Sequence, residues 1–116
     1  MEQFHHAICQ SLREAALRLP ETSEGTSCVN RAFKVRKKNF LYVGEKGEDV
    51  RVMVKLGPSV DKAEALADPR IQVGMHGWTT VRFSASEAPD TELLLEWVLE
   101  SFRNLAPKAL VKELDR

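Results

Sequence analysis

The chain has 116 residues, the length of one domain, and its 43% hydrophobic content is sufficient for a core without disulfides. Its 17 basic and 17 acidic residues cancel, so the net charge itself attracts no nucleic acid. No apolar run approaches the roughly 20 residues that cross a bilayer, and the N-terminus lacks a signal-peptide pattern, so we expect a cytoplasmic protein without membrane spans.

Residues 2–19 carry the first predicted element, an amphipathic helix. Apolar residues recur there at helical spacing, and Pro20 ends the pattern. Residues 21–27 are polar and contain Gly25, so we expect a loop. An antiparallel meander follows, with predicted strands at 30–35, 40–43 and 50–56 and tight turns at 36–39 and 46–49.

The second half of the chain combines two further strands with three helices. We expect a short helix at 60–66, a short strand at 71–73, a glycine-bracketed loop at 74–77 and a full strand at 78–83. A long helix starts at Pro89-Asp90, and a last short helix follows Pro107; the inward stripe of the long helix is Leu94, Trp97, Val98, Ser101 and Phe102. The order α-β-β-β-α-β-β-α-α predicts one α+β domain over residues 1–116, with two layers, an antiparallel sheet and helices mainly on one face.

Cysteine and histidine spacing predicts no disulfide, metal site or catalytic site. Cys9 lies in the helical pattern and Cys28 lies before a strand, so we expect two reduced thiols. The chain has no Cys-x-x-Cys pair and no His-Glu-x-x-His helix, and no nucleophile has a base at a predictive spacing. We therefore expect a protein that is not an enzyme and uses no cofactor.

A basic stretch in the meander is the main candidate site. Five basic residues lie on or beside the first hairpin: Arg31, Lys34, Arg36, Lys37 and Lys38. Arg51 and Lys55 extend the patch, whereas residues 84–100 hold acidic side chains and no Lys or Arg. A protruding basic hairpin contacts phosphates with little sequence preference. The alternative is that these charges only keep an edge hairpin soluble and unpaired.

Aromatic residues near this stretch bear on nucleic-acid binding, because exposed rings stack on bases. We assign Phe33 and Phe40 to the core, since hydrophobic sheet positions are usually buried, and leave Tyr42 open between core and surface.

A small-ligand pocket is a second candidate site. Met75, His76, Trp78 and Arg82 combine apolar walls with polar groups, as ligand pockets do. The alternative is structural: Trp78 fills the space where the loop meets the sheet, and His76 is an ordinary loop residue.

Several motifs occur in a familiar order along nearly the whole chain. They are Leu19-Pro20-Glu21, Phe33-Lys34-Val35, Lys38 with Phe40, Val54-Lys55-Leu56, Gly77-Trp78-Thr79-Thr80-Val81, Glu100-Ser101-Phe102-Arg103 and Pro107-Lys108. In this the chain resembles the MmcQ/YjbR-like family of small bacterial proteins. The resemblance implies a compact α+β domain described as a double-wing DNA-binding fold, similar in architecture to secretion-chaperone-like domains. Relatives tend to have a Gly before Lys in the first hairpin turn; here only Asn39 is well suited to a positive φ.

The leading hypothesis is a non-enzymatic protein that binds double-stranded DNA weakly and without sequence preference. Its phosphate contacts would come from the seven basic residues of the hairpin and the third strand. Two alternatives stay open: a protein-interaction or chaperone-like module, monomeric or homodimeric, that uses a sheet face or strand edge, and a small-ligand binder around Trp78.

Overall fold

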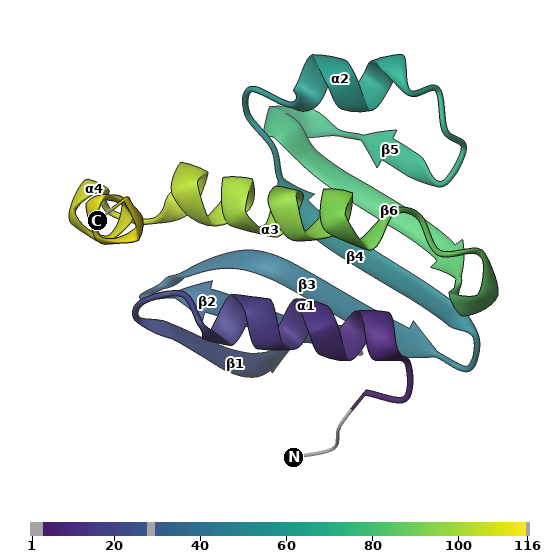
Figure 1. The fold of residues 1–116 in the computed structure, drawn as a ribbon, viewed down its shortest axis with the longest axis horizontal. Coiled ribbons are helices and arrows are strands. Elements are labelled where there is room, and N and C mark those ends of the chain that lie inside the picture. Colours follow the sequence, from purple (N-terminus) through teal and green to yellow (C-terminus); the bar gives the residue numbers. More distant parts are fainter. Residues whose placement is uncertain (1–3, 28–29, 116) are drawn as a thin grey trace.

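The fold is built on one antiparallel sheet of six strands (Figure 1). The computed structural model describes residues 4–27 and 30–115. The strands are β1 (Thr22–Ser27), β2 (Asn30–Val35), β3 (Lys38–Lys46), β4 (Asp49–Lys55), β5 (Ile71–Val73) and β6 (Trp78–Ser84). Their order across the sheet is β1-β2-β3-β4-β6-β5. The predicted α+β class with an antiparallel sheet is confirmed.

Four α-helices accompany the sheet in the described part of the chain: α1 (Ala7–Leu17), α2 (Val60–Ala65), α3 (Thr91–Leu105) and α4 (Lys108–Leu114). Two short 3-10 turns, η1 (Met75–Gly77) and η2 (Ala85–Glu87), flank β6. The elements predicted after residue 57 are confirmed, with boundaries shifted by a residue or two. Asp90 begins α3 because its carboxylate accepts a hydrogen bond from the backbone of Glu92 at 2.9 Å.

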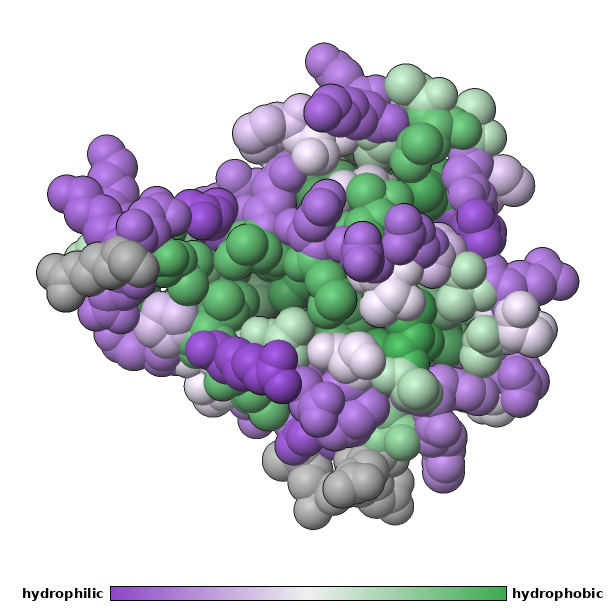
Figure 2. Space-filling model, in the orientation of Figure 1, coloured by the Kyte–Doolittle hydropathy of each residue, from purple (hydrophilic) through white to green (hydrophobic). Residues whose placement is uncertain are grey.

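Helices α1 and α3 lie across one face of the sheet, and the core lies between them and the strands (Figure 1). The alternation predicted for β4 is confirmed, because Val50, Val52 and Val54 are buried while the residues between them remain partly exposed. The predicted inward stripe of α3 is buried as well. Each large apolar side chain in this layer contributes about 1.5–3 kcal/mol through burial. Figure 2, in the same orientation, shows apolar residues along and between the two helices, with polar residues around them.

Strand β1 contradicts the sequence prediction, which assigned residues 21–27 to a loop. It pairs with β2 from Thr22 opposite Val35 to Ser27 opposite Asn30. Its central helix-facing position is occupied by Glu24, whose side chain is only 5% exposed and forms ion pairs with Arg13 at 2.7 Å and Arg31 at 2.8 Å. The prediction failed because a buried carboxylate with two partners stands where an apolar residue would signal a strand.

The turn between β2 and β3 is also shorter than predicted. Strand β3 already begins at Lys38, so Asn39 lies within the strand, and Arg36 adopts the positive φ of 55°. The register shifts between Phe33 and Lys34, and this irregularity lets both Phe40 and Leu41 point into the core. Arg36, and not Asn39, thus takes the left-handed conformation in this turn.

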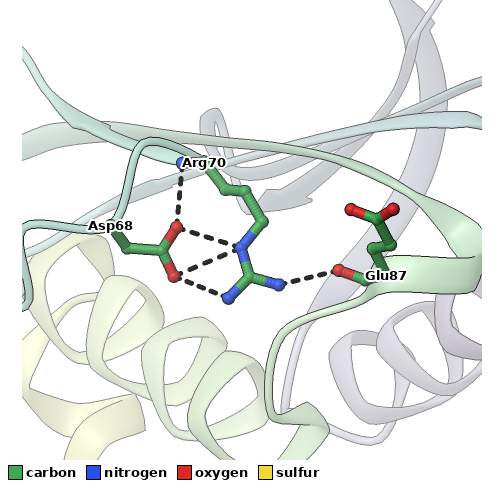
Figure 3. A network of polar contacts seen from close by, with 3 residues as sticks. All are labelled: Asp68, Arg70 and Glu87. Atoms are coloured by element: carbon green, nitrogen blue, oxygen red, sulfur yellow. Dashed lines mark hydrogen bonds and ion pairs between the residues drawn. The ribbon is translucent and has the colours of Figure 1, made fainter.

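An arginine ties the β5 edge of the sheet to the segment before α3 (Figure 3). The Arg70 guanidinium binds both carboxylate oxygens of Asp68 and donates to the backbone carbonyl of Glu87 at 2.7 Å. The hydrogen bonds from Arg70 lower the pKa of Asp68 to about 2. The positive charge of Arg70 is thus balanced by the carboxylate of Asp68.

Candidate nucleic-acid interface

The second face of the sheet, opposite α1 and α3, carries the polar half of the strand alternation. We call it the open face. Its strand residues fall into rows that run across the sheet, as the pairing registers define. The first row is Asn30, Gly44, Arg51 and Arg82, the second is Ala32, Tyr42, Met53, Thr80 and Gln72, and the third contains Lys55 and Trp78.

Positive charge dominates the open face. Lys34, Lys46 and Arg82 are exposed there and Arg51 and Lys55 are partly exposed, against the exposed acidic residue Asp49, which lies opposite Lys46. Arg51 lies directly opposite Arg82 in the register of β4 and β6. In the described part of the chain no acidic side chain forms an ion pair with either arginine; the Arg51 guanidinium donates only to the Asn30 side-chain oxygen, at 3.1 Å. Like charges directly opposite each other destabilise a sheet. The Arg51–Arg82 pair therefore lowers the stability of the free protein unless an anionic ligand binds between the two guanidinium groups.

A hollow of about 770 Å³ lies over this first row. It is lined by Asn30, Gly44, Glu45, Lys46, Asp49, Val50, Arg51, Arg82, Phe83 and Ser84. Gly44 leaves room for the Asn30 side chain in this row, because a Cβ at that position would collide with the Asn30 side-chain oxygen. Its volume falls within the range of about 300–1,000 Å³ that is typical of small-ligand sites. Two arginines at such a hollow can hold an anionic group between them.

An aromatic pair lies beside the basic row. The rings of Tyr42 on β3 and Trp78 on β6 have centroids 6.0 Å apart and are tilted by 58°. They approach each other across β4, where Met53 is opposite Tyr42 and Lys55 is opposite Trp78. Both aromatic residues are partly exposed, whereas Phe33 and Phe40 are fully buried as predicted. The structure thus assigns Tyr42 to the surface, a question that the sequence left open.

The basic residues predicted from the sequence do not form one patch. Lys34, Arg51 and Lys55 share the open face. Arg31 lies on the helix-facing side, where it pairs with Glu24 and its guanidinium lies 5.5 Å from the centroid of the Phe4 ring. The guanidinium of Arg31 is thus engaged in contacts within the fold, with a carboxylate and with an aromatic ring.

The turn between β2 and β3 carries the rest of the predicted set. Lys37 and Lys38 are exposed, and Arg36 binds Glu21 through hydrogen bonds of 3.0 and 3.2 Å. These hydrogen bonds raise the pKa of Arg36 above its ordinary value. The hairpin is not a separate wing, because β2 is paired with β1 along its whole length on the other side. The turn therefore forms a corner of the sheet.

The four residues predicted to form a ligand pocket, Met75, His76, Trp78 and Arg82, do not line one pocket. Met75 is 78% exposed and His76, with a φ of 58°, lies beside it in η1. Trp78 and Arg82 lie near opposite ends of β6. The hollow includes Arg82 but none of the other three. Alternation along β6 could have identified Trp78, Thr80 and Arg82 as one face, since Thr79, Val81 and Phe83 are the buried positions.

Cys9 lies on the buried side of α1, where its thiol faces Glu45. Burial, with a smaller effect of Glu45, raises the pKa of its thiol to about 12, so the thiol stays protonated at neutral pH. Cys28 lies outside the described residues. Within 4–27 and 30–115, no three His, Cys, Asp or Glu residues are close enough together to hold a metal ion.

One family model, YjbR, matches residues 17–104. The chain belongs to the YjbR family. This confirms the resemblance drawn from the motifs, and the six-stranded α+β architecture agrees with it. No curated protein matches the chain. None of the described helices of this YjbR protein has the length and apolar character needed to cross a membrane.

The Glu100-Ser101-Phe102 motif has a structural role in this YjbR chain. The buried Ser101 hydroxyl donates to the Phe40 carbonyl at 2.6 Å and accepts from the Lys55 backbone at 2.9 Å. Phe102 packs edge-on against Phe40, with ring centroids 5.6 Å apart. Glu100 accepts hydrogen bonds from the backbone of Gly57 and from the backbone and hydroxyl of Ser59. Helix α3 is thereby fixed to the end of β4.

The Gly77-Trp78 motif of the YjbR family determines where the indole lies. The Leu56 backbone donates to the Gly77 carbonyl at 2.8 Å. Gly77 has a φ of +82°, and a Cβ there would collide with the Leu56 carbonyl oxygen, so only glycine fits without strain. This close approach brings Trp78 next to Lys55 on the open face.

Proposed function

We propose that this YjbR protein binds nucleic acid through the open face of its sheet, with the β2–β3 turn as an extension of the contact surface. One observation carries the proposal: Arg51 and Arg82 are paired across two strands without an acidic partner in the described chain, at the edge of a hollow. Phosphate oxygens suit two guanidinium forks, because each fork can donate two hydrogen bonds to a phosphate and one phosphate has oxygens for both arginines.

The neighbouring charges extend this surface in two directions. Lys55 lies two rows from Arg51 on the same strand, and Lys34 continues the open face toward the exposed lysines of the turn, Lys37 and Lys38. Phosphate contacts of this kind give affinity with little sequence information. Arg31 and Arg36, both ion-paired within the fold, contribute less than the sequence hypothesis assumed.

DNA is the first ligand to test, because the resemblance to the YjbR family implies a DNA-binding fold. The experiment is fluorescence anisotropy of labelled single-stranded and double-stranded DNA, titrated with the protein at low and near-physiological salt. Binding should weaken steeply as salt rises, because each phosphate contact releases counterions. Absence of binding to every oligonucleotide at low salt would overturn the proposal.

A double variant and a matched control variant test whether the open face is the surface that contacts the nucleic acid. Arg51→Gln/Arg82→Gln should lower the slope of log affinity against log salt by about 1 to 2 units, at about 0.7–0.9 per phosphate contact. Lys108→Gln/Lys112→Gln removes the same charge from two exposed residues of α4 and should leave the slope unchanged. Equal effects of the two pairs would mean that only total charge matters.

A further inference from the structure

The Tyr42–Trp78 pair is a partly exposed aromatic surface on a basic sheet face. The two rings come from β3 and β6, the strands on either side of β4. Their centroids lie 6.0 Å apart over β4. Aromatic side chains are usually buried, and partly exposed rings that are surrounded by lysine and arginine require an explanation. Phosphate binding explains the cations but leaves the rings unexplained.

The dimensions of the sheet limit what kind of nucleic acid can reach these rings. The major groove of duplex DNA is about 12 Å wide and admits an α-helix or a two-stranded ribbon. The open face belongs to a sheet of six strands, and β2 is flanked on both sides, so no two-stranded ribbon is free at the β2–β3 turn. Base faces inside a duplex are covered by their stacked neighbours, whereas those of a single strand are accessible.

The spacing of the rows suits a single strand. Side chains on one face of a strand repeat every two residues, or about 7 Å. The first row, with Arg51 and Arg82, is therefore about 7 Å from the row of Tyr42, and Trp78 lies a further row away with Lys55 opposite it. The arginine row thus lies on one side of the aromatic pair and Lys55 lies beside Trp78, so a single strand whose bases stack on the two rings has cationic groups within reach of its phosphates.

We infer that the ligand of the open face is a single-stranded nucleic acid whose bases stack on Tyr42 and Trp78 while its phosphates bind Arg51, Arg82 and Lys55. The inference rests on the proposed function and specifies its substrate class. The hollow over the first row receives one phosphate with its sugar, and Lys34 lies where the strand continues toward β2. Either DNA or RNA supplies this chemistry.

The test compares four ligands in the same anisotropy titration: oligothymidylate, oligouridylate, an abasic strand of the same length, and a duplex of the same length. The abasic strand keeps the phosphates and lacks the bases. We expect oligothymidylate or oligouridylate to bind at least about fivefold more tightly than the abasic strand, since stacking contributes this much or more for each base. The two single strands, which differ in the 2′-hydroxyl and in the C5 methyl of the base, together show whether the face prefers DNA or RNA.

Two variants separate stacking from folding. Tyr42→Leu/Trp78→Leu should reduce the affinity for oligothymidylate to that for the abasic strand, and Tyr42→Phe/Trp78→Phe, which keeps two stacking rings, should restore most of it. Thermal unfolding of both variants identifies a change that only reflects lost structure. Equal affinity for the abasic strand and the oligothymidylate, or preference for the duplex, would overturn the inference while leaving the proposed function intact. Lack of binding to all four ligands would overturn both.

Discussion

Arg51 and Arg82 face each other directly across β4 and β6, on the face of the sheet that α1 and α3 leave exposed, and among the described residues neither has an acidic partner. Other arginines of this chain are ion-paired: Arg13 and Arg31 share Glu24, and Arg70 pairs with Asp68. The contrast between these ion-paired arginines and the opposed pair is the main reason for assigning the open face to an anionic ligand.

Changing Arg82 to Glu should separate stability from binding. Arg82→Glu turns a like-charge cross-strand pair into an opposite-charge pair, which should stabilise the sheet by about 0.2–1 kcal/mol. The same change should weaken the binding of nucleic acid and lower its salt dependence by more than Arg82→Gln does, because a carboxylate repels the phosphate that the guanidinium would bind. Urea unfolding and anisotropy measure the two effects, with Arg82→Gln as the intermediate case. A variant that is less stable and still binds DNA would contradict the assignment.

Removing the Ser101 hydroxyl should destabilise the protein by about 1–3 kcal/mol, because a buried backbone donor and acceptor lose their partner. The groups affected are the backbone N–H of Lys55 and the carbonyl of Phe40. Ser101→Ala is compared by urea unfolding with Ser86→Ala, a change at an exposed position. Equal stability of the two variants would show that the hydroxyl does not hold α3 to the sheet.

Replacing Gly77 should be more damaging than replacing Gly25. Gly77→Ala forces a Cβ into the Leu56 carbonyl at a positive φ, with an expected cost of about 1–3 kcal/mol. Gly25→Ala meets nothing within 4 Å and should change stability by no more than about 0.5 kcal/mol. Thermal unfolding compares the two. If Gly77→Ala is tolerated, the Leu56 contact does not fix the position of Trp78.

Glu100 should make stability depend on pH in the acid range. Burial alone would raise the pKa of Glu100, but the hydrogen bonds from Ser59 and Gly57 lower it below its ordinary value of 4.5. The folded state therefore favours the carboxylate, and the stabilisation is present above about pH 4.5 and is lost as the pH falls through the lowered value.

Glu100→Gln tests this pH dependence. The variant should be about 1–3 kcal/mol less stable than the parent at neutral pH, and the difference should shrink as the pH falls through the lowered pKa of Glu100, where the parent carboxyl becomes protonated too. Urea unfolding at a series of pH values gives the comparison. A difference that is the same at every pH would mean that the charge of Glu100 plays no part.

Most of the fold follows from patterns in the sequence, and the exception has a physical cause. The valines of β4 and the apolar stripe of α3 repeat with the periods of a strand and a helix, so their elements were predictable. Strand β1 was missed because its inward position is Glu24, which is acceptable only with Arg13 and Arg31 beside it. Such pairing depends on tertiary contacts that no local pattern reveals.

The candidate site was predictable in its residue types but not in its grouping. Arg51, Lys55, Trp78 and Arg82 were all singled out from the sequence, in two separate sets. Only the registers of β3, β4 and β6 bring them onto one face and add Tyr42. Arg31, two residues before Phe33 on the same strand, falls on the helix-facing side for the same reason, since a strand alternates its side chains.

The most direct test of the claim that the open face binds nucleic acid is to map the binding surface by NMR, by adding unlabelled oligothymidylate to nitrogen-15-labelled protein. The account predicts the largest chemical-shift changes at the backbone amides of Tyr42, Arg51 and Arg82 and at the indole N–H of Trp78, with small changes at the buried Trp97 and along α1 and α3. Changes that concentrate on the helix-covered face, or on η1 around Met75 and His76, would contradict the account.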